Sequence, residues 1–475
     1  MVGLPKFGVL KSKCNDSYLR YINEIGSPIR SFLKYSGQEI LSPFTKFEFE
    51  QAKSDPSLFH IKCCYNNKYW VSWACDHGFI IAGAEDKEED RSKWTCTLFR
   101  PIYDSSQQSY RFQHVHLGLN VVLWRAGSHF RDCLRAHLST PDRHLCDLSI
   151  VIDWESMWLL PKFIVFKSEN GFYLSGRRRH NLPYLQFLSQ SLEDPSIMME
   201  TVFTNDGKFR IKSIFFQRFW KRGTLDWIFA DLDDSNSQDP DALFSPIKLS
   251  PLVVALRNLG ADKFIKRYTN FGIESGLNAA VSEIDKFSHL RIIEPVFSRE
   301  INNVVFYLSE AKIYNEVVIM LATREARNNF NVPNTARITF SYIDNRTSSW
   351  ASSISTKLDV KTRIKSRVPL VSDGRKFDIS SAKFDEEYKW GEIITVSKPK
   401  EVIYETIIPP NSASVITLIV TKGSYEIPFS YKQADVLIGG KEVEYHLEDG
   451  IYRGTNFYDL KYDVRTRNIC GGPNE

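Results

Sequence analysis

One short segment gathers aromatic and polar side chains of the kind that can bind a carbohydrate. An aromatic ring can stack on the apolar face of a pyranose, and a few fixed polar groups can read its hydroxyls. Large aromatics are more often buried, so Tyr69 and Trp73 also have an interpretation as core residues. Polar residues on a turn, such as Asp76 and His77, are better placed for direct contact. The segment NNKYWVSWACDHGF supplies six candidates: Asn67, Tyr69, Trp73, Asp76, His77 and Phe79.

A second segment, SISTKLDVKTRIKS at 353–366, alternates almost without error. This period of two predicts a β-strand with one apolar face and one strongly charged face. An ordinary half-buried strand alternates in the same way, so the pattern alone does not say what lies against the apolar face. One parity holds Ile354, Thr356, Leu358, Val360, Thr362 and Ile364, and the other holds Lys357, Asp359, Lys361, Arg363 and Lys365.

Motifs for catalysis and for metal binding are missing from the sequence. It contains no GxSxG, no phosphate-binding glycine loop, no GxGxxG and no HExxH. His114 and His116 would lie on one face of a strand, but no third metal ligand is evident, which favours two structural histidines. Paired carboxylates for glycoside hydrolysis need only converge in space, so a carbohydrate-active enzyme stays as a distant alternative. The sequence predicts a protein that is not an enzyme, with no cofactor and no metal.

The composition is that of a folded protein of about three domains. The chain has 475 residues, of which 43% are hydrophobic, and its 13% aromatic content is typical of β-rich packing. Its 61 basic residues are nearly matched by 57 acidic ones, and the formal net charge of +4 argues against a nucleic-acid partner.

The cysteines and the N-terminal segment indicate a cellular location. No secretory leader and no run of about 18 apolar residues occurs, so we expect a cytoplasmic or nucleocytoplasmic protein. The eight cysteines form no CxxC pairs, and they predict mostly buried thiols in a reducing compartment.

The first 300 residues contain a duplication. The segment KFGVLKS at Lys6 recurs as KFIVFKS at Lys162, and HIKCCYNNKYW ending at Trp70 recurs as RIKSIFFQRFW ending at Trp220. LFRPI at Leu98 likewise recurs as LFSPI, so two homologous domains of about 150 residues stand in tandem.

Each copy contains a shorter repeat. In the second copy an apolar strand with a basic residue, a polar turn and an aromatic-led strand recur at Lys167, Lys212 and Arg257, about every 45 residues. A hairpin repeated three times can close into a pseudo-threefold barrel, which is a β-trefoil. The first copy shows the same plan at Lys11 and Lys62, with Arg125 as a blurred third.

After about Phe297 the strands become longer, and Ser and Thr become frequent. Segments such as IIPPNSASVITLIVTKGSYEIPFSY predict long alternating strands. The predicted fold is all-β, with two tandem β-trefoil domains (1–155 and 156–297) followed by an elongated antiparallel β module (298–475).

The segments GLPKF, YLRY, FHIKCCYNNKYWVSW, SKWTCTLFRPIY and VIDWESM resemble the tandem β-trefoil lectins of the amaranthin type, or agglutinin domains. The resemblance implies binding of galactose- or N-acetylgalactosamine-containing glycans, with sites near the contact between two subunits of a head-to-tail dimer. The turn used by this family reads Asn-His-Tyr-Trp in amaranthin, where this chain has Asp76-His77-Gly78-Phe79.

The remaining third, with SSWASSISTKLDVKTRIKS, YKWGE, YEIPFSY and EDGIYRGTNFYDLKY, resembles the aerolysin-type pore-forming module of natterin-like proteins. The resemblance implies that a hairpin at 353–381 is released to build a transmembrane β-barrel, with VPLVSDG as its turn. The lipid-facing residues would be Ile354, Leu358, Val360, Thr362, Ile364, Phe377 and Ile379. The lumen-facing residues would be Lys357, Lys361, Arg363 and Lys365, which would favour anions.

Together these resemblances predict a chimeric lectin that associates conditionally with membranes. We expect it to bind glycoproteins or glycolipids, to be a dimer in solution, and to form a larger ring as a pore, with a role in plant defence. The alternative is a multivalent stress or defence lectin whose aerolysin-type module only mediates oligomerisation.

Overall fold

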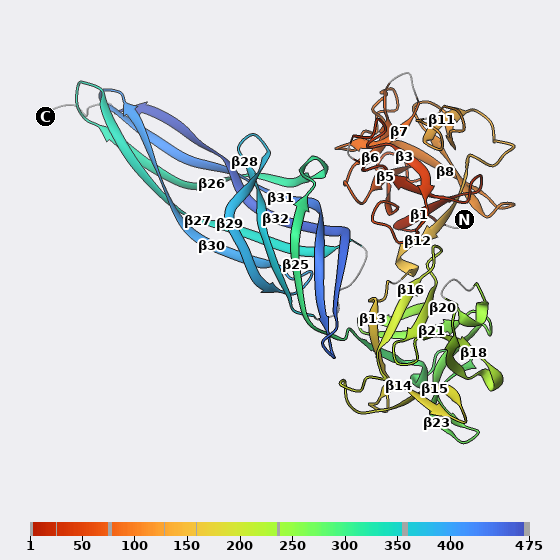
Figure 1. Ribbon diagram of the computed structural model, residues 1–475. Helices are drawn as coiled ribbons and strands as arrows, with labels where there is room; N and C mark the ends of the chain where they lie inside the picture. The colour runs from red at the N-terminus through yellow and green to blue at the C-terminus, as the bar shows by residue number, and fades with distance from the viewer. Residues whose placement is uncertain are drawn as a thin grey trace. The chain divides into compact units, whose positions relative to one another are not determined.

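The computed structural model of the protein describes residues 3–24, 26–74, 78–127, 129–157, 159–234, 238–353 and 360–469, with the side chains of 380–384 excepted. Within these ranges the chain is built of strands and short 3-10 turns, arranged in two 12-stranded sheets and one 8-stranded sheet (Figure 1). No helix of the described ranges is long and apolar enough to cross a membrane. The predicted fold class, two β-trefoils followed by an elongated antiparallel module, is confirmed.

The first trefoil is closed by its first strand, which pairs with the last strand and also with β2 and β4. This closure joins the two ends of the domain in one barrel. The strands are β1 (Phe7–Ser12), β2 (Tyr18–Tyr21), β3 (Leu33–Gly37), β4 (Phe47–Gln51), β5 (Phe59–Cys63), β6 (Tyr69–Ser72), β7 (Ile80–Ala84), β8 (Leu98–Asp104), β9 (Ser109–His114), β10 (Leu119–Leu123), β11 (Leu134–Leu138) and β12 (Leu148–Asp153).

The second trefoil repeats this plan, with its first strand paired to its last, β13 to β24. Its strands are β13 (Phe163–Lys167), β14 (Tyr173–Arg179), β15 (Leu182–Ser189), β16 (Met199–Phe203), β17 (Phe209–Ser213), β18 (Arg218–Arg222), β19 (Ile228–Leu232), β20 (Phe244–Ser250), β21 (Val253–Asn258), β22 (Lys263–Asn270), β23 (Ile273–Val281) and β24 (Leu290–Ile293).

The basic residue of the sequence repeat has a structural partner in the strand that follows it. Lys167 pairs in register with Tyr173, Lys212 with Phe219, and Arg257 with Phe264. Each cation lies over its partner's ring, 4.9, 5.9 and 6.0 Å from the centroid. A register shift directly after each aromatic residue bends the strand toward the cap of the trefoil.

The first trefoil keeps this pair in two of its three repeats. Lys11 is in register with Tyr18, and Lys62 with Tyr69. The third pair is Gln113 with Asn120, again followed by a register shift. The assignment of the third repeat to Arg125 is therefore wrong, since that residue follows β10. Gln113 and Asn120 lack the positive charge and the aromatic ring that mark the other repeats, so this repeat is hard to recognise in the sequence.

One tryptophan anchors each trefoil core. The buried indole of Trp70 packs edge-on against Phe47 and Phe99, with ring centroids 5.4 and 5.6 Å apart. Its counterpart Trp220 packs on Phe166 and Phe244 at 5.7 and 5.9 Å. Large aromatics bury the most apolar area per residue, so these clusters dominate the two cores.

A disulfide joins Cys14, just after β1, to Cys146, just before β12. The prediction that the cysteines are mostly thiols is thus wrong for this pair, because their 132-residue separation gave no sign that the barrel brings them together. Cys64, Cys96 and Cys133 remain thiols, and burial raises the pKa of Cys133 to about 11.

The C-terminal module is a sheet of much longer strands, up to 27 residues, in the order β29-β28-β25-β31-β32-β27-β30, with β26 paired to β31. Its aromatic core includes Trp350, Tyr425, Phe429 and Tyr452. The strands are β25 (Val296–Phe306), β26 (Lys312–Asn328), β27 (Asn334–Ser352), β28 (Thr362–Ser372), β29 (Lys376–Tyr388), β30 (Ile394–Ile408), β31 (Ser412–Leu437) and β32 (Glu442–Asn468).

Candidate functional site

The cap of the first trefoil carries an aromatic cluster where the hairpins β2–β3, β6–β7 and β10–β11 meet. The Trp73 ring stands edge-on to Phe32, with centroids 5.1 Å apart, and 6.1 Å from Phe130. Phe79 stacks on Phe130 at 4.8 Å. Isolated bridges from Phe32 to Ile81 and from Phe79 to Arg135 tie the three hairpins together. These contacts fix the backbone of the cap and so restrict the positions of the side chains that it exposes.

The predicted carbohydrate contacts divide sharply by burial. Trp73 is 42% exposed, so its side chain reaches the surface, which contradicts its interpretation as a core residue. Tyr69 is buried, as the core interpretation expects, and its hydroxyl donates to Glu50. Phe79 and Asn67 are buried as well, and Asn67 has a left-handed φ of 56° in the turn before β6.

These three residues support the loop, because buried groups offer no surface to a sugar. Asp76 and His77 lie outside the described residues.

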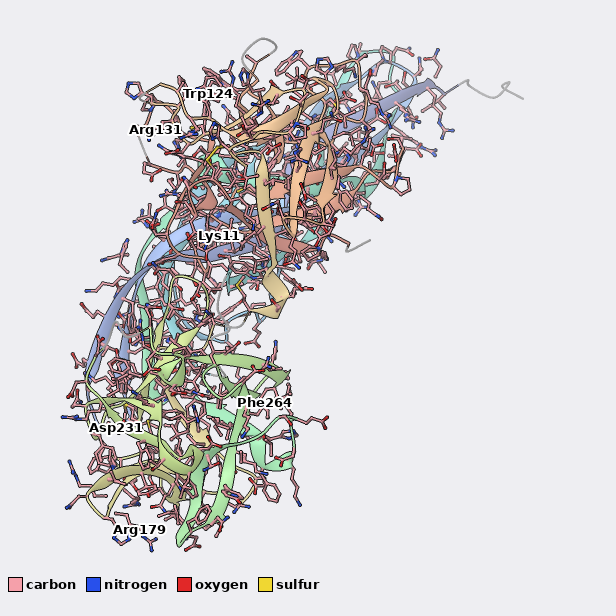
Figure 2. The ribbon with its side chains drawn as sticks, turned by 90° about the vertical axis from the view of Figure 1, so that its right-hand side faces the viewer. Lys11, Trp124, Arg131, Arg179, Asp231 and Phe264 are labelled. Atoms are coloured by element: carbon pink, nitrogen blue, oxygen red, sulfur yellow. A yellow bond between two sulfur atoms is a disulfide. The ribbon has the colours of Figure 1, made fainter. Side chains whose placement is uncertain are left out.

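Sequence reasoning missed the residues that the third hairpin brings to this cap. The guanidinium of Arg135 lies 4.1 Å from the ring centroid of Trp124 and 5.0 Å from that of Phe79. Trp124 is half-buried, lies at the same end of the domain as exposed Arg131, and is well separated from Lys11 (Figure 2). The threefold repeat was the available signal, because equivalent hairpins must meet at one cap.

The equivalent loop of the second trefoil has no exposed tryptophan. The Trp73 amide donates to the Phe79 carbonyl at 2.8 Å, and the Gly223 amide donates to the Trp227 carbonyl at the same distance. Gly223 therefore stands where the first copy has Trp73, and Trp227 is buried like Phe79. Ion pairs occupy this loop instead, with Asp226 bridging Arg222 and Lys263 at 2.7 and 3.3 Å.

The hairpin expected at 353–381 exists, but it is displaced along the chain. β28 begins at Thr362 and pairs antiparallel with β29, and the turn is Asp373-Gly374-Arg375. The predicted turn VPLVSDG is only partly correct: its last two residues, Asp373 and Gly374, lie in the turn, whereas the residues before them continue β28. Val371 is buried in the core, while Gly374 and Arg375 have the positive φ values that a tight turn needs. Ile354, Lys357 and Leu358 lie outside the described residues.

The apolar side of the hairpin packs on the aromatic core of the module. Thr362 and Ile364 are buried, Val360 and Phe377 are half-buried, and Phe377 contacts the Tyr425 ring at 5.6 Å. Ile379 is 44% exposed. A register shift between Arg367 and Pro369 reverses the buried parity, so the strict alternation ends there.

The charged side of the hairpin is neutralised by carboxylates. Arg363 lies 2.7 Å from Asp385, Lys365 lies 2.6 Å from Glu300, and Lys361 lies 3.8 Å from Glu387. The hydrogen bond from Lys365 is the leading cause that lowers the pKa of Glu300. The face that was predicted to favour anions therefore has carboxylates beside its cations.

Four residues from neighbouring strands hold the turn end of the hairpin, and we call them the hairpin clasp: Asn456, Asp459, Glu316 and Tyr425. The buried amide of Asn456 accepts from Val371 N at 3.1 Å and donates to Val371 O at 2.7 Å. The Asp459 carboxylate accepts from Gly374 N at 2.8 Å, Glu316 pairs with Arg375 at 2.7 Å, and the Tyr425 hydroxyl donates to the Pro369 carbonyl at 3.0 Å.

The histidine pair has structural partners. His114 accepts from Leu117 N through Nδ1 and donates to the Cys96 carbonyl through Nε2, at 3.3 and 3.2 Å. His116 Nδ1 lies 3.0 Å from the Arg91 carbonyl oxygen. In the part of the chain that the structure covers, no three His, Cys, Asp or Glu side chains are grouped to hold a metal ion.

Several solved structures are similar to parts of the chain at low sequence identity. The chain is similar to the solved structures of the lamprey immune protein (TM-score 0.32, 10% identity, 64% of this chain and 91% of that chain) and of an aerolysin-like protein from Bombina maxima (TM-score 0.25, 12% identity, 35% and 99%). It is also similar to parasporin-2 from Bacillus thuringiensis (TM-score 0.20, 19% identity, 35% and 74%).

No curated protein matches the chain. The family model of the agglutinin domain matches residues 2–153 and again residues 158–294, more than half of the sequence. The chain therefore belongs to the agglutinin domain family.

Proposed function

We propose that the protein is a lectin without catalytic activity, which binds galactose- or N-acetylgalactosamine-type glycans and inserts the hairpin β28–β29 into glycosylated membranes to form a pore in defence. Its membership of the agglutinin domain family supports the lectin role. The site on the first trefoil cap is supported by Trp73, whose partly exposed ring packs edge-on against Phe32 and is of the type that stacks on a pyranose.

The single observation that carries the pore hypothesis is the construction of the hairpin. Its strands have 11 and 13 residues, and a transmembrane β-strand needs about 9–11. Its charges pair with one another across the strands, which reduces the cost of enclosing them in a barrel lumen. Ile364, Val371 and Phe377 of its apolar side pack in a core of the same module, so for these residues lipid would replace protein contacts rather than water.

In this mechanism two agglutinin domains concentrate the protein on a glycosylated surface, where several weak contacts act together. Protomers then assemble into a ring, and the hairpin clasp opens. Lys361, Arg363 and Lys365 would face the lumen together with Asp385 and Glu387, so this pore would be less selective for anions than one lined by cations alone.

The experiment is dye release from liposomes that carry galactose- or N-acetylgalactosamine-terminated glycolipids, compared with bare liposomes over a range of pH. The proposal expects release that depends on the glycolipid and is blocked by free sugar. Binding without release at any pH would contradict pore formation but leave the lectin role intact.

A matched pair of variants tests the hairpin itself. Ile379→Arg changes a residue that is already exposed, so the resting fold should persist, yet it would place a charge on the lipid side at a cost of about 2–4 kcal/mol. We expect glycan binding to remain and release to disappear. Ile403→Arg, at a similarly exposed position of β30, is the control and should release dye normally.

A second candidate function is a multivalent lectin whose C-terminal module only mediates oligomerisation. The hairpin clasp favours it, because Asn456 bonds both the N–H and the carbonyl of Val371 and Asp459 accepts from Gly374 N, and these bonds hold the hairpin on the module. Asn456→Ala separates the two functions. It should increase the rate of dye release if the hairpin inserts, and it should leave liposomes intact if the hairpin is only structural.

A further inference from the structure

Two loops of the C-terminal module form a braced tip at one end of its long strands. The loop 329–333 joins β26 to β27, the loop 409–411 joins β30 to β31, and β32 ends beside them (Figure 1). The buried Asn328 amide donates to the carbonyl oxygens of Val332, Ile408 and Pro409 at 2.8, 3.0 and 3.1 Å. Asn411 N donates to the Phe330 carbonyl at 3.1 Å, and Ile469 N donates to the Asn411 carbonyl at 2.8 Å.

The two hydrogen-bonded loops and the strand end beside them expose apolar side chains to solvent. Phe330, Val332 and Ile407 are 66%, 65% and 66% exposed, and Pro333, Pro409 and Pro410 are also at the surface. Apolar side chains on a loop normally turn inward, since burying each one gains about 1.5–3 kcal/mol. Here hydrogen bonds from Asn328 and Asn411 fix the backbone with these side chains outward. We call Phe330, Val332 and Ile407 the apolar tip.

The charges behind the apolar tip are mainly cationic. The strand ends nearest the tip carry five arginines and three carboxylates: Arg324, Arg327, Arg337, Arg465 and Arg467, with Glu325, Glu405 and Asp463. Arg465 and Arg467 keep 83% and 68% of their side-chain surface exposed although each lies near a carboxylate. We call these five arginines the arginine collar. The apolar tip and the arginine collar together match the boundary between lipid headgroups and acyl chains, where cations bind phosphate and aromatic rings enter the apolar layer.

We infer that the apolar tip is a membrane anchor for anionic phospholipid bilayers, which acts independently of the glycan sites and of the hairpin β28–β29. Phe330 and Val332 enter the outer acyl region, and the arginine collar binds the headgroups. The preference for a bilayer over a protein partner follows from position and charge together: Phe330 and Val332 stand on the loop 329–333, Ile407 lies at the neighbouring end of β30, and the nearest excess charge is positive. Because the anchor needs no sugar, it would hold the protein where lectin contacts are transient.

The test is co-sedimentation of the full chain with vesicles that contain no glycolipid, made of phosphatidylcholine with about 30% phosphatidylserine or of phosphatidylcholine alone. We expect binding to the anionic vesicles that free galactose does not inhibit and that weakens in high salt, because salt screens the arginines. Phe330→Asp with Val332→Asp should reduce this binding by roughly tenfold or more, from the lost apolar insertion. Arg465→Glu with Arg467→Glu should remove the preference for anionic vesicles.

The matched control is Val318→Asp, an equally exposed apolar position on β26 that lies twelve residues before Phe330. It should bind vesicles like the unmodified chain. Equal binding by the tip variant and the unmodified chain, or no binding by the unmodified chain, overturns the proposal. It is also overturned if the tip substitutions abolish self-association in solution without changing vesicle binding, since a second copy is then the occupant. Failure of dye release leaves this result untouched, because no glycolipid is present.

Discussion

The two trefoils share a backbone plan, but they have diverged in opposite ways. The second copy keeps all three cation–aromatic pairs and has no cysteine. The first has lost one pair to Gln113 and Asn120, and it has gained a disulfide, a buried His114 and an exposed Trp73. The regular second trefoil thus has ion pairs in the loop after β18, whereas the less regular first trefoil carries the candidate site in the equivalent loop. This difference indicates that a β-trefoil can lose one of its three repeated pairs when another interaction, here a disulfide, stabilises the same domain.

Removing the disulfide should have the largest effect on the difference in stability between the two trefoils. In Cys14→Ser with Cys146→Ser, the first trefoil should lose about 2–5 kcal/mol of unfolding free energy, because the unfolded chain regains the freedom of a 132-residue loop. Hydrogen exchange read by mass spectrometry separates peptides of 7–153 from those of 163–293. Equal loss of protection in both copies would show that they unfold as one unit.

Acid should separate the two copies by a smaller amount. Burial lowers the pKa of His114 to about 4, and the Leu117 amide that donates to Nδ1 leaves no room for a second proton. The folded state prefers the neutral ring, so stability is complete above the unfolded pKa of 6.5 and falls as the pH drops toward 4.

At pH 5 this loss amounts to about 2 kcal/mol, an order-of-magnitude figure from the two pKa values. His180 and His289 of the second copy lie at the surface. We expect the same peptides to exchange faster at pH 5 only in the first trefoil, and His114→Gln to weaken that dependence, leaving the part due to His60, whose pKa burial also lowers. Acid sensitivity of the second copy alone would contradict this assignment.

Trp73→Ala tests whether the surface difference has a functional meaning. Loss of the stacking ring should weaken glycan binding by roughly tenfold, or about 1.4 kcal/mol, by titration calorimetry. The matched control is Leu225→Ala, an exposed side chain in the equivalent loop of the second trefoil, which should bind as before. The reverse result would move the principal site to the second copy.

Restoring the missing pair should have the smallest effect. Gln113→Lys with Asn120→Tyr recreates the cation–aromatic contact at the position where the register already matches the other repeats. A stabilisation of about 0.5–1 kcal/mol is expected, visible as a rise of a few degrees in the Tm of the first trefoil. A lower Tm would mean that the cap of the first copy has repacked around Asn120.

The extent of sequence-based prediction differed between these regions for physical reasons. The second trefoil was predictable because Lys167, Lys212 and Arg257 repeat at equal spacing, and each meets an aromatic partner a few residues later. The third repeat of the first copy was misassigned because Gln113 and Asn120 preserve the register without preserving the chemistry. Periodicity in side-chain type reveals a repeat only while that type is retained.

In the C-terminal module and at the cap of the first trefoil, burial and long-range contacts limited what could be predicted from the sequence. The pattern of 353–366 indicated an amphipathic strand, but the start of β28 at Thr362 depends on packing against residues far along the chain. The hairpin clasp residue Asn456 meets Val371 across 85 positions, which no local pattern records. Likewise, the exposure of Trp73 and the burial of Phe79 follow from how three hairpins meet, and both are aromatic residues on the same loop.

The disulfide also determines how the first trefoil would carry mechanical load. Tension that arrives from the second trefoil reaches β12 first, and that strand lies outside the covalent loop. Peeling of β12 must stop at Cys146, because the sulfur bridge returns the force to Cys14 beside the N-terminal strand. The hairpins of the cap, Trp73 among them, lie inside this loop and cannot be unravelled from the chain end. A chain pulled through the second trefoil would thus yield elsewhere before the cap that holds Trp73 is drawn out.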